Sequence, residues 1–303
     1  MADEHLEGAT LNLPRGIPGR TAMLSGARRV ATDASDDAET IGRLAGDCLR
    51  LEIDTYPKPG LVSYRDCGAH RDMDAALLVR SADLLVPYFI DLAAAGAAGE
   101  KMSRLRQIGL AAEAAMLACT GGVNTHRGAI FGLGLLVAAA GLQARYGIAM
   151  PLGQIVANRW GQDILAGPVP LHSHGAIVAR RYSAGGARAE AARGFPAVFH
   201  AALPALRKVE ASLPNDPEAS RVQACMVLIA TVDDTNLLYR GGPQGLAFAR
   251  ACAAGFLAGG GVARPGWRRA AGKIHASFVA RNLSPGGCAD LLAMTLFAGR
   301  RTR

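Results

Sequence analysis

The sequence predicts an all-α protein, a single-domain bundle of about nine or ten helices. Alternating polar and apolar residues, the pattern of a half-buried strand, are nearly absent, and β-branched residues are sparse. Alanine is abundant and has the highest helix propensity. Alanine and glycine on facing surfaces also allow helices to approach closely, so the same residues that favour helices favour their tight packing.

The composition is that of a globular chain with a large core. Of the 303 residues, 50% are hydrophobic and 19% are charged, whereas an average domain has about 25% charged residues. A disordered chain needs low hydrophobicity and many charges, so disorder is excluded. A chain of about 300 residues buries roughly three quarters of its surface on folding.

The first predicted helix follows a leader over residues 1–35. Asp36 and Glu39 have the spacing of a capping box, and apolar residues follow at helical steps up to Glu52. Pro57 ends this helix near residue 55. Further helices are expected over 72–95 (kinked at Pro87), 102–119, 129–146, 152–164, 187–206, 218–231, 244–258, 266–281 and 286–299, so that residues 36–303 form one helical catalytic domain.

Neither a membrane span nor a secretory signal is predicted. The longest uncharged apolar run covers residues 128–142, shorter than the roughly 20 residues that a spanning helix needs. The amino terminus is acidic, unlike a signal peptide. The six cysteines are scattered without a CxxC motif, as expected for core residues in a reducing compartment. We therefore expect a cytoplasmic protein.

The net charge of +8 is unevenly distributed. Residues 264–303 contain eight Lys and Arg but one acid, Asp290. A basic excess favours anionic partners. The basic residues have no aromatic residues interleaved with them, which favours a phosphate-rich small molecule over nucleic acid.

Five polar clusters stand out because charge is scarce elsewhere. In the first, TYPKPGLVSYRDCGAHRDMD over residues 55–74, Lys58 and Arg71 are candidate phosphate ligands. Asp72 and Asp74 form a candidate carboxylate pair for Mg²⁺, which prefers one or two carboxylates together with substrate phosphates. The alternative for Asp72 is a helix N-cap.

The second cluster covers residues 111–131. Glu113 lies in an apolar helix, where a carboxylate is costly unless it is paired or functional. Thr125 is a possible N-cap and His126 a possible structural histidine, but this glycine-flanked helix start is also a candidate anion site. Its polar residues are Asn124, Thr125, His126 and Arg127.

Three further clusters follow in the second half of the chain. Residues 186–196 contain Arg188 and Glu190, which a solvated helical face would also explain. In residues 233–242, two acids follow an apolar helix, where they oppose the helix dipole and capping is disfavoured. The polar residues there are Asp233, Asp234, Asn236 and Arg240.

The fifth cluster, SPGGCADLLA, covers residues 284–293. Ser284, Gly286 and Gly287 begin a helix whose exposed N–H groups would cradle a phosphate. Ser284 would cap that helix, and Asp290 would stabilise its first turn.

Together the five clusters resemble the triphosphoribosyl-dephospho-CoA synthase family. The resemblance runs from Leu51 to Phe297 and rests on TYPKPGLV, GAHRDMD, GVNTHRGAIF, RAEAARGFP, DDTNLLYRGG and SPGGCADLLA. The family more often has Lys at Arg127 and His at Tyr239. The resemblance implies an all-helical transferase in which the 2′-hydroxyl of 3′-dephospho-CoA displaces adenine from C1′ of ATP, with Mg²⁺.

The implied product is a prosthetic-group precursor for malonate decarboxylase or citrate lyase, of which we favour the former. It would pass to an acyl-carrier-protein transferase, and a homodimer is possible. The alternatives are a metal-dependent hydrolase of a phosphorylated substrate and a non-catalytic anion-binding module.

The chemistry of this reaction assigns roles to the polar residues. Cleavage of an N-glycosidic bond builds positive charge on the ribose, which nearby carboxylates such as Asp233 stabilise. Glu113 or Asp234 would be the base, and His126 or a carboxylic acid would protonate adenine. Arg71, Arg127 and Arg188 would hold the triphosphate, with Lys58 and residues 284–287 as secondary ligands.

Overall fold

The structure, a computed structural model, describes residues 23–168, 178, 181–182 and 185–301, with side chains from residue 36 onward. This part of the chain contains eleven α-helices and no strand, which confirms the all-α prediction. The helices are α1 Met23–Asp54, α2 Ala75–Ala97, α3 Met102–Cys119, α4 Arg127–Tyr146, α5 Leu152–Ala166, α7 Gly186–Ala192, α8 Leu203–Ser212, α9 Pro217–Thr231, α10 Thr235–Ala258, α11 Trp267–Ala280 and α12 Gly286–Arg301. A π-helical turn, η1 Ala197–Ala202, and a 3₁₀ turn, η2 Gly261–Ala263, complete them.

Most helices lie within a few residues of their predicted bounds, but α1 does not. It begins at Met23 rather than near Asp36, so the expected leader is helical over 23–35. No proline interrupts the chain between Pro18 and Pro57, and nothing in the backbone stops this extension. Residues 1–22 of the expected leader lie outside the described residues.

Two further helices differ from their predicted bounds, and in both the backbone adopts a positive φ. The expected helix over 187–206 is split into α7, η1 and α8, because Gly194 and Phe195 adopt positive φ values of 81° and 58°. α10 begins at Thr235, earlier than predicted, and bends at Gly242, where φ is 60°. Pro243 follows the bend and has no backbone N–H to donate.

α4 lies at the centre of the core and crosses α2 in close contact. A Cβ atom on Gly96 would lie 1.9 Å from the Ala138 carbonyl oxygen, and one on Gly141 would lie 2.0 Å from that of Ala93. The two helices therefore run antiparallel with their backbones nearly touching, which only glycine permits. α4 is long and apolar enough to cross a membrane, but 72% of that apolar window is buried inside the molecule, as in a core helix.

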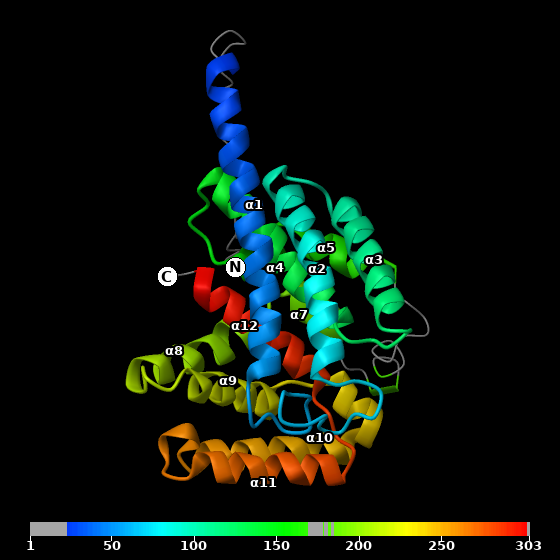
Figure 1. The fold of residues 1–303 in the computed structure, drawn as a ribbon, viewed down its shortest axis with the longest axis vertical. Helices are drawn as coiled ribbons and strands as arrows, with labels where there is room; N and C mark the ends of the chain where they lie inside the picture. The colour runs from blue at the N-terminus through cyan, green and yellow to red at the C-terminus, as the bar shows by residue number, and fades with distance from the viewer. Residues whose placement is uncertain (1–22, 169–177, 179–180, 183–184, 302–303) are drawn as a thin grey trace, which may run out of the picture.

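α12 runs through the middle of the bundle in Figure 1, against α1, α4 and α9. α10 and α11 lie at the lower end, next to the loop that joins α1 to α2. Arg240 of α10 fastens this loop by donating a hydrogen bond to the Ala69 carbonyl at 2.9 Å. All six cysteines are free, but the prediction that they are core residues is wrong for Cys67 and Cys119, which are exposed.

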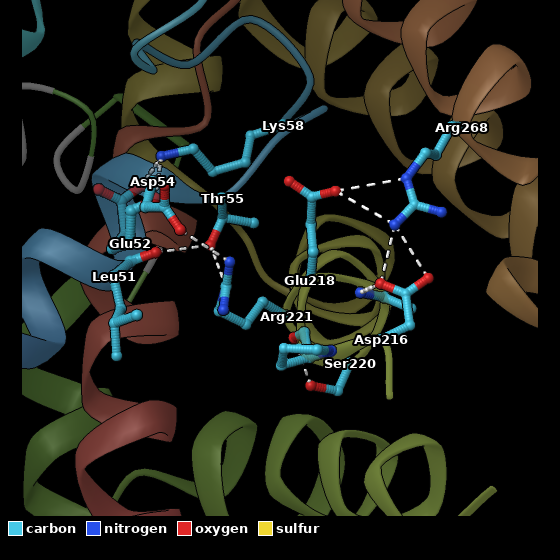
Figure 2. A network of polar contacts seen from close by, with 12 residues as sticks. Leu51, Glu52, Asp54, Thr55, Lys58, Asp216, Glu218, Ser220, Arg221 and Arg268 are labelled. Carbon is cyan, nitrogen blue, oxygen red and sulfur yellow. Dashed lines mark hydrogen bonds and ion pairs between the residues drawn. The ribbon is translucent and has the colours of Figure 1, made fainter. Parts of the chain in front are cut away.

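A polar network joins the carboxyl end of α1 to α9 (Figure 2). Arg221 of α9 donates to Asp54 at 3.0 Å and to the Thr55 hydroxyl at 2.9 Å. Arg268 at the start of α11 pairs with Asp216 and Glu218 around the start of α9. The Arg221 contacts fix the end of α1, where the first polar cluster begins.

Candidate active site

All five polar clusters meet at one cavity of about 2080 Å³. The two exceptions among the predicted site residues are Lys58 and Asp74, which do not line it. The predicted residues that do line it are Arg71, Asp72, Glu113, Asn124, Thr125, His126, Arg127, Arg188, Glu190, Asp233, Asp234, Asn236, Arg240, Ser284, Gly286 and Gly287. The clusters are far apart in the sequence, and the helices bring them together because each cluster lies at a helix end.

Lys58 and Asp74 have structural partners instead. Lys58 is completely buried, and its Nζ donates to the carboxylate Oε1 and the backbone oxygen of Glu52, each at 2.5 Å (Figure 2). Asp74 is the N-cap of α2 and accepts the Leu77 N–H at 2.7 Å. A phosphate-binding role for Lys58 is therefore wrong, since its ammonium group faces Glu52 inside the protein.

The predicted carboxylate pair for Mg²⁺ does not converge on one point. Asp72 lines the cavity and is exposed, while Asp74 caps α2 outside it. Among the residues that the structure describes, no group of three or more His, Cys, Asp or Glu side chains forms a metal site. Asp72 remains a single carboxylate that faces the cavity.

Glu113 forms an ion pair with Arg127 across the cavity wall. Arg127 Nη2 lies 2.6 Å from Glu113 Oε1, and their side chains are 38% and 29% exposed. The pairing explains how an apolar, alanine-rich helix tolerates a carboxylate. Both groups stay open to the cavity and can reach a ligand there.

His126 is buried at the N-cap position of α4. Its Nδ1 lies 2.9 Å from the Ser81 hydroxyl, which in turn lies 2.7 Å from the Thr125 hydroxyl. Burial, and secondarily the charge of Lys58, lowers the pKa of His126 to about 4. The imidazole is therefore neutral at pH 7, which makes it a poor acid for a departing base.

Asp234 caps two helices at once. Its Oδ1 accepts the N–H groups of Asn236 at 2.8 Å and Leu237 at 3.0 Å at the start of α10. Its Oδ2 accepts the Cys288 N–H at 2.8 Å in the first turn of α12. The expectation that capping is disfavoured here was wrong, because α10 begins directly after Asp234 instead of near residue 244.

This capping also changes the expected phosphate cradle at residues 284–287. The Cys288 N–H is already used by Asp234, and the Ser284 hydroxyl lies 2.8 Å from His70 Nε2. Arg240 Nη2 lies 3.2 Å from His70 Nδ1, and the Asp72 carboxylate lies 3.4 Å from the same nitrogen. Burial and Arg240 lower the pKa of His70, which agrees with a neutral ring.

Several other predicted ligands have protein partners. Arg188 caps the carboxyl end of α5 by donating to the carbonyls of Ile164, Leu165, Gly167 and Pro168. Asp233 pairs with Arg250 at 2.8 Å and remains mostly exposed. Glu190 accepts the Ala197 N–H at 2.7 Å, and burial raises its pKa. Arg188 thus has its donors occupied by carbonyl groups, whereas Arg71 lines the cavity and Arg127 lines it while paired with Glu113.

Two cavity carboxyls were not among the predicted site residues. Asp290 of α12 lines the cavity next to Gly128, where a Cβ would come within 1.9 Å of its Oδ2. Glu52 also lines it while paired with Lys58. Burial, followed by the charges of Glu52 and Asp234, raises the pKa of Asp290 well above its usual value. Glu52 carried one sequence signal, as the polar residue of an otherwise apolar helix face.

The comparisons with known proteins agree on one family. The model of the ATP:dephospho-CoA triphosphoribosyl transferase family matches residues 38–303. A protein of Pseudomonas putida described as a probable 2-(5''-triphosphoribosyl)-3'-dephosphocoenzyme-A synthase is 43% identical over 268 residues, 86% of this chain and 94% of its own. Relatives of the same description from Stutzerimonas stutzeri and Azotobacter vinelandii are each 40% identical, over 90% and 87% of this chain and 95% and 91% of their own.

No solved structure matches the chain. The family match covers all five polar clusters, and the relatives align over nearly their whole length. The resemblance seen in the sequence is therefore confirmed, and the chain is a transferase that belongs to the ATP:dephospho-CoA triphosphoribosyl transferase family.

Proposed function

We propose that this enzyme joins the 2′-hydroxyl of 3′-dephospho-CoA to C1′ of the ATP ribose and releases adenine. The observation that carries the proposal is the cavity of about 2080 Å³ where carboxylates and arginines of all five clusters meet. Pockets for one drug-sized ligand measure about 300–1,000 Å³. The larger volume suits two nucleotides held side by side, as a direct transfer between them requires.

The residues suit a displacement at an anomeric carbon. Positive charge builds on the ribose as the bond to adenine breaks, and cavity carboxylates stabilise it. Glu113 is the better candidate for the base, because Asp234 is buried and its oxygens already accept three backbone N–H groups. Glu113 faces the cavity, and Arg127 holds its carboxylate in place.

Arg71 and Arg127 are the candidates to hold the triphosphate, which enters as its Mg²⁺ complex. Asp72 is the one member of the predicted metal pair that faces the cavity, and a single carboxylate with phosphate oxygens is a usual Mg²⁺ environment. A closed cavity would also exclude water, which would otherwise hydrolyse ATP at the ribose. The reaction would take place in the cytoplasm.

The direct test is incubation of the protein with ATP, Mg²⁺ and 3′-dephospho-CoA. Chromatography should detect free adenine, and mass spectrometry should detect an adduct equal to both substrates less adenine. CoA, with its 3′-phosphate, is the control acceptor. Release of phosphate without adenine would instead indicate a hydrolase, and salt-sensitive binding without turnover would indicate a binding module.

We further propose that the adduct is the prosthetic-group precursor for malonate decarboxylase rather than citrate lyase. The purified adduct, offered with an acyl-carrier-protein transferase of each system, should be attached to the malonate decarboxylase carrier. Attachment to the citrate lyase carrier alone would contradict this assignment.

A further inference from the structure

The start of α4 lies between two carboxyl groups that come from different helices. Arg127, its first residue, pairs with Glu113 of α3 at 2.6 Å. The next residue, Gly128, packs against Asp290 of α12, whose oxygen occupies the space of a Cβ. Both carboxyl groups line the cavity, so two carboxyl groups from different helices lie at the part of its wall where α4 begins.

The two carboxyl groups are held differently. The Glu113 carboxylate is paired with the Arg127 guanidinium group, which holds it at the cavity wall. Among the described residues, the charges that act on Asp290 are those of the acids Glu52 and Asp234, and burial with these two charges raises its pKa well above the usual value. Asp290 is thus suited to carry a proton into the cavity, while Glu113 has a cationic partner there.

We propose that Asp290 is the acid that protonates adenine as it leaves the ribose, with Glu113 as the opposite base. This inference rests on the proposed function. The bond from C1′ to adenine N9 breaks with its electron pair going to adenine, and the Asp290 carboxyl gives its proton to a ring nitrogen. The 2′-oxygen of dephospho-CoA bonds to C1′ and loses its proton to Glu113. Exchange with solvent then restores both carboxyl groups, and no net proton is consumed.

The surroundings of Asp290 stabilise the anion that this step leaves. The backbone N–H of Ala129, in the first turn of α4, acts on the carboxyl group in the direction that favours its anion. The positive end of the α4 dipole lies at the same place. Glu52 and Asp234 therefore keep Asp290 protonated before the transfer. The N–H of Ala129 and the start of α4 stabilise the carboxylate that the transfer leaves.

Other described titratable groups lie on α12 itself and on the elements that pack against it. Burial raises the pKa of Cys225 of α9 to about 12 and that of Cys288 of α12 well above its usual value, so both thiols are neutral. α8 packs at the far end of α12, against Gly299, and the histidine of η1, His200, is exposed. Rising pH therefore acts on Asp290 by removing its own proton.

The test compares wild type with Asp290→Asn by following adenine release with ATP and dephospho-CoA across pH. The wild-type kcat should fall as pH rises through the Asp290 ionisation. Asp290→Asn should be roughly 10²–10⁴-fold slower, the usual contribution of an acid catalyst, and should lack that fall. Its Mg²⁺ half-saturation should equal that of wild type. Asp83→Asn, an exposed partner of Arg50 outside the cavity, is the matched control and should keep full activity.

Each alternative gives a different result. A slow Asp290→Asn that keeps the alkaline fall would make the residue structural, and a raised Mg²⁺ half-saturation would make it a metal ligand. Full activity would also overturn the proposal. If wild type forms no adenine and no adduct, the proposed function fails and this inference fails with it.

A second variant keeps the test decisive if Asp290→Asn does not fold. Glu52→Gln removes a negative charge that acts on Asp290, while its amide oxygen can still accept from Lys58. The Asp290 pKa should then fall, and the alkaline limb of kcat should move to lower pH. An unmoved limb, or a wild-type rate that is flat across this range, would overturn the proposal.

Discussion

At the scale of single residues, the pair of Glu113 and Arg127 gives the clearest prediction about activity. Glu113→Gln keeps the size of the side chain but removes the base, so adenine release should fall by roughly 10²–10⁴-fold. Arg127→Lys keeps the positive charge but loses the planar guanidinium group, which can bind a phosphate through two N–H groups. It should therefore mainly raise KM for ATP. Steady-state kinetics with both substrates separate the two effects. Wild-type turnover by Glu113→Gln would remove Glu113 from the chemistry.

His126 gives a prediction about stability and pH. Its pKa is about 4 in the folded protein and about 6.5 in the unfolded chain, so the unfolded chain takes up the proton first as pH falls. The contribution of His126 to the free energy of unfolding is therefore complete above pH 6.5 and is lost as pH falls from 6.5 to 4. The loss amounts to about 3 kcal/mol. Urea unfolding across this range measures it.

The control for that measurement is a pair of histidine variants. His126→Asn should unfold with a weaker pH dependence than wild type, because it has no proton to take up. His200→Asn, at an exposed histidine, should leave the pH dependence unchanged. Identical slopes for wild type and His126→Asn would show that another group is responsible.

At the scale of helices, the crossing of α2 and α4 depends on glycine. In Gly141→Ala the new Cβ would lie 2.0 Å from the Ala93 carbonyl oxygen, which belongs to the backbone and cannot rotate away. We expect a loss of roughly 1–3 kcal/mol or more in the free energy of unfolding. Gly272→Ala in α11, with nothing within 4 Å of its Cβ, should stabilise by roughly 0.5–1 kcal/mol. Equal midpoints for the two variants in urea would contradict this packing.

Arg188 gives a second prediction at this scale. It donates to four carbonyls at the end of α5, a geometry that needs the guanidinium fork. Arg188→Lys should therefore lower stability by roughly 1–3 kcal/mol while leaving KM for ATP unchanged. Thermal unfolding and kinetics on the same sample test both parts. A raised KM for ATP with unchanged stability would instead indicate that Arg188 binds the triphosphate.

At the scale of the whole molecule, the cavity joins segments from most of the chain. Ligands that contact all five clusters bind only the folded state, so MgATP with dephospho-CoA should raise Tm. The gain in stability at 100 times Kd should be about 2.7 kcal/mol. Adenine alone, which lacks the phosphates, is the control. An unchanged Tm at substrate concentrations that saturate turnover would place the binding site elsewhere.

The helices, their order and the family were predictable from the sequence because each depends on local signals. The bounds of α3 match because no competing signal lies within it, and the start of α12 follows from Pro285 and its glycines. The missed start of α10 shows the limit. Asp234 reads as an unfavourable acid after α9, and its role as a cap requires knowing that another helix begins at Thr235.

The tertiary structure alone decided which polar residues stabilise the fold and which ones face the cavity and can act on a ligand. Lys58, Asp74 and Arg188 are as polar as Arg71, but their polar groups bind Glu52, the start of α2 and the end of α5. The sequence shows Asp290 only as a first-turn residue of α12. Its raised pKa depends on burial and on the nearby charges of Glu52 and Asp234, which come close to it only in the folded protein. Residue type and spacing determine which groups a helix end carries. Electrostatic environment depends on neighbours far away in the sequence, and packing determines them.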